Sequence, residues 1–127
     1  MIKIIQVPLY RCAIICLIES SVEEWKKWYK QNEKNIDVKS YSDVIEELNS
    51  EGNLGFAFQT EYKDHIFAIK EKRIDLLVHE AFHTANSILY SRGYVPDEGA
   101  EPLAYLLEFV VREILLIING KCEGIKS

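Results

Sequence analysis

Residues 73–92 constrain this 127-residue chain more than any other stretch, because their apolar side chains recur with the period of an α-helix. Side chains three and four residues apart predict one buried stripe along this helix. The stripe consists of Val78, Ala81, Phe82, Ala85, Ile88 and Leu89. His79, Glu80 and His83 fall on the opposite, polar side. We expect the helix to end before Gly93, since glycine commonly follows the last helical residue.

The polar side of this predicted helix carries the pattern HExxH, written His79-Glu80-Ala81-Phe82-His83. Residues four apart on a helix lie about 5–6 Å apart at Cβ. Both imidazoles can therefore bind one zinc ion at about 2.0–2.1 Å. The glutamate after the first histidine then lies beside the metal, where it can take a proton from water. We predict His79 and His83 as zinc ligands and Glu80 as the general base.

A third zinc ligand is expected elsewhere in the chain, because a catalytic zinc ion usually has three protein ligands and one open position. Residues 103–118 predict a second helix that is apolar nearly all round and therefore buried. Its narrow polar stripe consists of Glu101, Tyr105, Glu108 and Arg112. Glu101, the first member of the stripe, is the predicted third ligand. Glu98, in the loop before it, is the alternative.

The same stripe offers a group that can stabilise a developing oxyanion. Tyr105 lies one turn beyond Glu101 and is the best-placed candidate, with Tyr90 and Tyr94 as alternatives. Glu108 and Arg112 are four residues apart and are expected to pair with each other.

The stretch from "VHEAFHTANSIL" to "EPLAYLLEFVVREIL" resembles small HExxH proteins encoded by bacteriophages and prophages, of the gluzincin (minigluzincin) type of zinc metallopeptidase. The "EPLAYL" segment is similar to the Glu-x-x-Ala-Tyr pattern of those proteins. The resemblance covers about residues 73–118. It implies zinc ligands at His79, His83 and Glu101 and a general base at Glu80.

The rest of the chain predicts short strands and helices in the order β-α-α-β-β-α-α. The elements before the motif helix are a strand at 10–18, extended from Ile2 past a bulge at Pro8, a helix at 22–31, a short helix at 42–48, and strands at 54–60 and 65–70. Ser21 to Glu24 form a capping-box signal for the first helix. This order matches an α+β fold with a zincin-like core. A short antiparallel or mixed sheet packs against the HExxH helix, and a ligand-bearing C-terminal helix follows.

The sheet edge has a predicted role in this arrangement. In such enzymes an edge strand lies above the metal and pairs with an extended peptide substrate. Strand 65–70, which leads into the motif helix, is the candidate for that edge. His65 itself is expected to be exposed to solvent, and Trp25 and Trp28 are expected to pack in the core.

Composition limits the remaining choices. The length suits one domain, residues 1–127. A net charge of −5 argues against nucleic acid as a partner. We find no secretory signal and no apolar run long enough to span a membrane. Cysteines 12, 16 and 122 form neither a metal pair nor an obvious disulfide set, which indicates a reducing cytoplasm. Cys12 and Cys16 are expected to be small core residues.

The leading functional hypothesis is hydrolysis of a peptide bond in a peptide or protein substrate. The first alternative is a zinc-bound but catalytically silent protein-interaction module of phage or prophage origin, and the second is a hydrolase that acts on another kind of bond. The sequence does not fix the oligomeric state, and the predicted strand edge leaves a dimer open.

Overall fold

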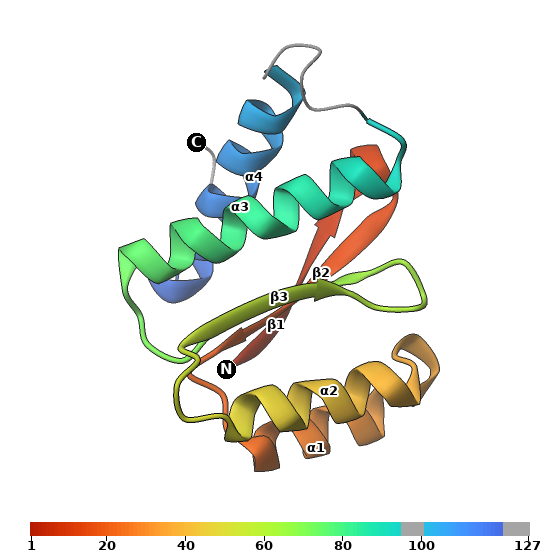
Figure 1. The fold of residues 1–127 in the computed structure, drawn as a ribbon, viewed down its shortest axis with the longest axis vertical. Helices are drawn as coiled ribbons and strands as arrows, with labels where there is room; N and C mark the ends of the chain where they lie inside the picture. The colour runs from red at the N-terminus through yellow and green to blue at the C-terminus, as the bar shows by residue number, and fades with distance from the viewer. Residues whose placement is uncertain (95–100, 121–127) are drawn as a thin grey trace.

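The computed structural model describes residues 1–94 and 101–120, which form a four-stranded mixed sheet and four α-helices (Figure 1). The elements in chain order are β1 (Ile2–Val7), β2 (Cys12–Ile18), α1 (Val22–Gln31), α2 (Val38–Asn49), β3 (Gly55–Gln59), β4 (His65–Ile69), α3 (Ile74–Ser91) and α4 (Glu101–Ile118). Two 3-10 turns, η1 (Pro8–Tyr10) and η2 (Glu33–Asn35), join neighbouring elements. The predicted α+β class is confirmed. Among the described residues, no helix is long and apolar enough to cross a membrane.

The strands lie side by side in the order β1-β2-β4-β3. The two outer pairs, β1 with β2 and β3 with β4, are antiparallel, and the central pair β2 with β4 is parallel. All residues of β4 and nearly all of β2 are buried. Strands covered on both faces read as continuous apolar runs rather than alternating ones, which is the pattern of Cys12–Ile18.

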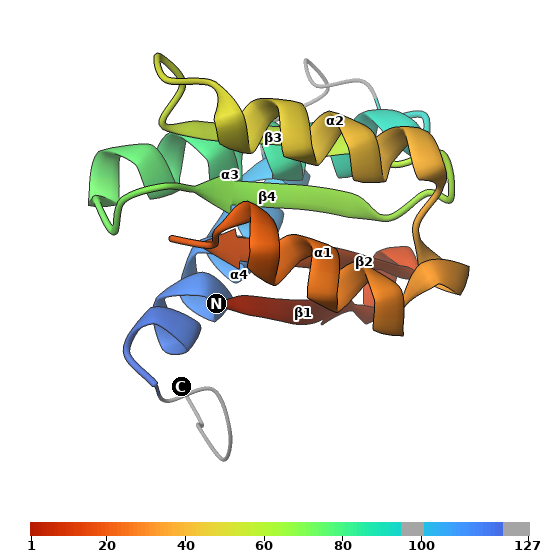
Figure 2. The ribbon, with the colours of Figure 1, turned by 90° about the horizontal axis from the view of Figure 1, so that it is seen from below.

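Each face of the sheet has its own hydrophobic core. In Figure 1, α3 and α4 lie above the sheet and α1 and α2 lie below it; Figure 2 shows α1 and α2 from their own side. Along β4 the side chains alternate between the two cores: Phe67 and Ile69 face α3 and α4, whereas Ile66 and Ala68 face α1 and α2. Trp25 is fully buried in the second core, as predicted.

Two buried thiols belong to the core on the α3 side. Cys12 and Cys16 are both free and buried, which confirms their prediction as small core residues. Burial raises the pKa of both thiols, strongly so for Cys16.

The first strand differs from its prediction. The expected extension of one strand from Ile2 through Pro8 is wrong, because the chain reverses direction at this point. Pro8 to Tyr10 form the 3-10 turn η1, and Arg11 follows in the left-handed conformation with φ of 53°. β1 and β2 are therefore the two strands of a hairpin. A proline that opens a turn and a proline at a bulge look alike in sequence.

The helix α2 begins four residues before the predicted Ser42. Asp37 is its N-cap, and its Oδ2 accepts a hydrogen bond of 2.9 Å from the backbone N–H of Ser40. The other oxygen of the same carboxylate accepts from the N–H of Glu61 at 3.0 Å, in the loop between β3 and β4. The cap therefore also holds α2 to the β3–β4 loop.

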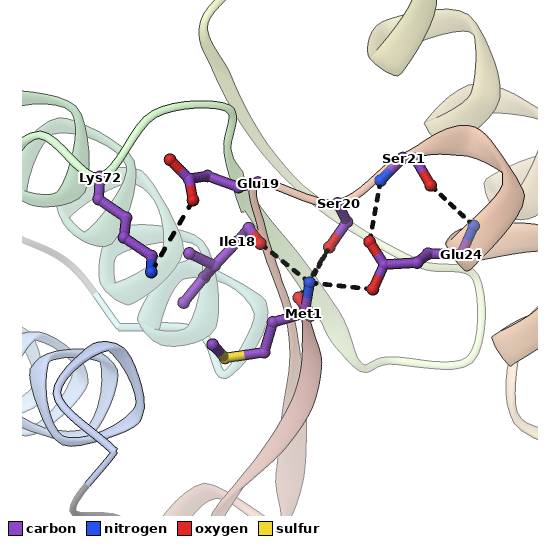
Figure 3. A network of polar contacts seen from close by, with 7 residues as sticks. All are labelled: Met1, Ile18, Glu19, Ser20, Ser21, Glu24 and Lys72. Atoms are coloured by element: carbon purple, nitrogen blue, oxygen red, sulfur yellow. Dashed lines mark hydrogen bonds and ion pairs between the residues drawn. The ribbon is translucent and has the colours of Figure 1, made fainter.

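The first turn of α1 confirms the capping box, since Ser21 Oγ accepts from Glu24 N–H and the Glu24 carboxylate accepts from Ser21 N–H. The Met1 amino group donates to Ile18 O at 3.0 Å, to Ser20 Oγ at 3.1 Å and to Glu24 Oε2 at 3.1 Å (Figure 3). The Ser21 N–H, and next the Met1 amino group, lower the pKa of Glu24. These contacts tie the start of α1 to the end of the β1–β2 hairpin.

The predicted hairpin between residues 54–60 and 65–70 is confirmed, but its edge assignment is wrong. β4 lies between β2 and β3, so both of its backbone edges are hydrogen-bonded. The edge strand on this side is β3. Sequence spacing shows which strands form a hairpin, whereas the parallel pairing of β4 with the distant β2 is a long-range contact that local patterns do not reveal.

His65 also differs from its prediction, because only 1% of its surface is exposed. It pairs with Ile14 on one side and Gln59 on the other, so the first residue of β4 is already interior. Neither ring nitrogen has a hydrogen-bond partner within the described residues. Burial, and next the positive charge of Arg92, lower the pKa of His65 to about 4.

We predict that His65 makes the protein less stable in acid. The pKa of this ring is lower in the folded chain than its ordinary 6.5, so the unfolded chain binds the proton more tightly. The stability from the neutral ring is fully present above pH 6.5 and is lost as the pH falls toward 4. The measurement is the free energy of unfolding in urea, with a chelator present. Between pH 7 and pH 4.5 this free energy should fall by about 2–3 kcal/mol more in the wild type than in His65→Leu. Equal losses would contradict this assignment.

Candidate metal centre

The motif helix α3 runs from Ile74 to Ser91, close to the predicted range. It packs on β3 and β4 and against α4 (Figure 1). Its buried face is rotated from the predicted stripe: Val78 and Phe82 are 43% and 42% exposed, whereas Glu80 is only 7% exposed. A helical wheel gives the apolar direction but does not show which neighbour covers each flank. Here β3 covers the flank that carries Glu80.

The two histidines of the motif lie close together on α3. The Nε2 atoms of His79 and His83 lie 3.2 Å apart, and the rings are inclined at 75° with centroids 4.7 Å apart. Two nitrogen ligands of a tetrahedral zinc ion, each bound at about 2.0–2.1 Å, lie roughly 3.3–3.4 Å from each other. Both side chains are exposed, so an ion can reach them from solvent. The pair therefore fits a metal such as zinc.

Glu80 lies on the same turn but points toward the sheet. Its side chain passes so close to Gly55, the first residue of β3, that a Cβ built at Gly55 would be 2.9 Å from Glu80 Cγ and 3.0 Å from Glu80 Oε2. Burial raises the pKa of Glu80, and the charges of His79 and His83 oppose this shift without cancelling it. A carboxylate with a raised pKa is a stronger base near neutral pH.

The third ligand is not brought to this pair within residues 1–94 and 101–120, where no three His, Cys, Asp or Glu side chains form a group able to hold a metal ion. Glu101 is the first residue of α4 and is exposed. Glu98, the alternative, lies outside the described residues. The third ligand therefore stays a prediction for both residues.

Tyr105 lies beside η1 in the structure. Its side chain is 67% exposed and lines an apolar cavity of about 230 Å³ together with residues 7–10 and Phe109. The alternatives Tyr90 and Tyr94 are 75% and 42% exposed. An oxyanion role for any of the three stays a prediction.

The polar stripe of α4 confirms one expected contact. Glu108 and Arg112 form an ion pair of 3.9 Å across one turn of the helix. Both side chains are exposed, so this pair contributes little to stability.

Gly55 is the site residue that sequence reasoning missed. The available signal was a glycine at the start of a predicted strand, where the absence of a side chain often marks a close approach of another group. That signal does not identify the approaching group. The partner became apparent only once α3 was placed on β3.

Comparison of the chain with models of protein families, with curated proteins and with solved structures gave no match. The resemblance to gluzincin-type proteins therefore depends on the motif and on the geometry of α3. We treat it below as a proposal.

We predict that Gly55→Ala destabilises the protein through its contact with Glu80. The added Cβ would also lie 3.1 Å from the backbone oxygen of Ala68, so the strand has little room to yield. The expected cost is about 1–3 kcal/mol in urea unfolding. In a Glu80→Ala background the same change should cost about 1 kcal/mol less, because the conflicting side chain is gone. Equal costs in the two backgrounds would place the conflict elsewhere.

We also predict that the protein binds about one equivalent of Co²⁺ or Zn²⁺ at neutral pH. The visible absorption of Co²⁺ reports the binding, and free metal at 100 times Kd should raise the stability by about 2.7 kcal/mol. His79→Ala and His83→Ala should each weaken binding, because each removes one of the two converging imidazoles. Glu101→Ala and Glu98→Ala identify the third ligand, with Glu108→Ala as the matched control on α4. Unchanged affinity in both histidine variants would refute the site.

Proposed function

We propose that this chain is a zinc-dependent metallopeptidase of the gluzincin type, similar to the small HExxH proteins of phages and prophages. Its substrates would be peptides or proteins, and its location would be the cytoplasm. The observation that carries the proposal is the convergence of His79 and His83 Nε2 at 3.2 Å on the helix that also directs Glu80 against an edge strand.

The residues of this chain would divide the reaction between them. His79 and His83 would hold the ion, with Glu101 or Glu98 as the third ligand. The chemistry that zinc supplies when bound is polarisation of a carbonyl group and acidification of water. Glu80 would take a proton from the attacking water and return it to the leaving amine nitrogen. The raised pKa of Glu80 supports this role, since the carboxyl group holds the transferred proton more readily.

The position of β3 supports a peptide as the substrate. β3 is an edge strand and begins at Gly55, in contact with Glu80. An extended peptide can add to such an edge through backbone hydrogen bonds. This arrangement would carry the peptide backbone past the catalytic carboxylate.

One observation favours the second candidate, a zinc-bound protein-interaction module without catalytic activity. Ile74, Val78 and Phe82 are 62%, 43% and 42% exposed and recur every four residues along α3. They form an apolar stripe beside the motif. Exposed apolar side chains in such an arrangement are typical of a contact surface for another protein.

Glu80→Gln distinguishes the two candidates. The glutamine keeps the size of the side chain and leaves both imidazoles in place, so about one equivalent of metal should still bind. Loss of the general base should reduce peptide hydrolysis by about 10²–10⁴-fold. The measurement is cleavage of a peptide mixture, followed by mass spectrometry, with metal content determined on the same samples. Glu108→Gln is the matched control.

The opposite outcome would support the interaction module. Wild-type protein that holds one equivalent of zinc, yet cleaves no peptide in the mixture and behaves like Glu80→Gln, would contradict the peptidase proposal.

A further inference from the structure

A large cavity lies apart from the HExxH motif, at the C-terminal end of α3. It has a volume of about 580 Å³, within the range of cavities that bind small ligands. Its walls come from η1 and the residue after it, from the end of β3 and the loop after it, and from the end of α3. The lining residues that carry the argument are Tyr10, Arg11, Gln59, Lys63 and Arg92.

The charge of this cavity is opposite to that of the chain. Arg11, Lys63 and Arg92 line it, and among the residues that the structure describes none of the lining side chains is acidic, although the chain has a net charge of −5. Within residues 1–94 and 101–120, none of the three cations forms an ion pair with a carboxylate. Asp64, next to Lys63, points elsewhere: its Oδ1 accepts a hydrogen bond of 2.9 Å from Ala13 N–H.

Arg92 is held in place at the cavity wall. Its Nε donates to the backbone oxygen of Tyr10 at 3.1 Å, and a second guanidinium nitrogen donates to the same oxygen. The last carbonyls of α3 are also occupied, since the N–H groups of Arg92, Gly93 and Tyr94 donate to them. These bonds reduce the negative potential that a free helix C-terminus would bring to the cavity. The charge of Arg92 also reaches the interior, where it adds to burial in lowering the pKa of His65.

The cavity lies in line with the proposed catalytic centre. Gly55 contacts Glu80 at one end of β3, and Gln59 lines the cavity at the other end. Four residues of strand span about 13 Å, and the eleven-residue step from Glu80 to Ser91 on α3 spans about 16 Å. An extended peptide on β3 would therefore reach the cavity about four to five residues from the bond beside Glu80.

We propose that this cavity binds a carboxylate of an extended peptide, either an acidic side chain or the C-terminal carboxylate. That the carboxylate belongs to a peptide rests on the proposed function, whereas the binding of an anion in this cavity does not. The three cations match this chemistry: Arg92 contributes its positive charge, and the guanidinium of Arg11, which has no hydrogen bond within the described residues, can bind a carboxylate through paired N–H groups. If the peptidase proposal holds, cleavage should fall about four to five residues from the bound carboxylate.

The test measures the binding of three ten-residue peptides, of otherwise equal composition, to the Glu80→Gln protein. A chelator and low salt are present, so that binding requires neither metal nor cleavage. The first peptide has two central glutamates and blocked ends, the second has glutamines instead, and the third has the glutamines and a free C-terminal carboxylate. Calorimetry gives the affinities, and NMR amide shifts report on Gln59 and Ser91. The first or the third peptide should bind about tenfold more tightly than the second, and which of them does so identifies the source of the carboxylate.

Single charge removals locate the site. Arg92→Gln should abolish the preference for the charged peptide, and Lys63→Gln should reduce it about twofold to fivefold. Lys63 provides the safer variant, because no side-chain hydrogen bond within the described residues depends on it. Lys26→Gln, on α1 across the sheet, removes the same charge and should change nothing. Equal affinities for all three peptides, or equal losses in Lys26→Gln and Lys63→Gln, would overturn the proposal and leave the peptidase proposal untouched.

Discussion

The rest of the structure depends on the burial of β2 and β4 on both faces. These two strands form the parallel centre of the sheet, and their side chains are almost all inaccessible to solvent. A parallel pair needs a long crossover between its strands, and here α1, α2 and β3 supply it. The crossover helices cover one face of the sheet, which leaves the other face to α3 and α4. The apolar runs of β2 and β4 thus determine a layered arrangement of helices, sheet and helices.

That arrangement explains which parts of the candidate centre are determined by residues close in sequence and which depend on contacts with distant segments. The separation of the two imidazoles follows from one turn of α3 and needs no other element. The surroundings of Glu80 depend on the sheet, because α3 lies over β3 and β4 and brings the carboxylate against Gly55. The same packing sets the end of α3 beside η1, where Arg92 binds the Tyr10 carbonyl. The surroundings of Glu80 and of Arg92 therefore depend on residues that are distant from α3 in the sequence.

The sequence alone predicted the helices, turns and caps that depend on a short hydrophobic period or on a local motif. It identified the helix around His79 and His83, the Ser21 capping box and the β3–β4 hairpin, because each depends on residues a few positions apart. It missed the burial of His65, the edge position of β3 and the reversal of the chain at Pro8. These depend on which strand lies next to which, and parallel pairing between β2 and β4 joins segments about fifty residues apart. No spacing rule within either segment encodes that contact.

The surroundings of Glu80 bear on the choice between a peptidase and a silent metal-bound module. Burying a carboxylate raises the free energy of its charged form, and within the described residues no hydrogen bond to this carboxylate offsets that cost. A site that only held a metal would be more stable with an uncharged side chain at this position. The contact also excludes any side chain at Gly55. Glu80 thus weakens the fold, and the proposed role as a base beside the two imidazoles would account for its presence at this position.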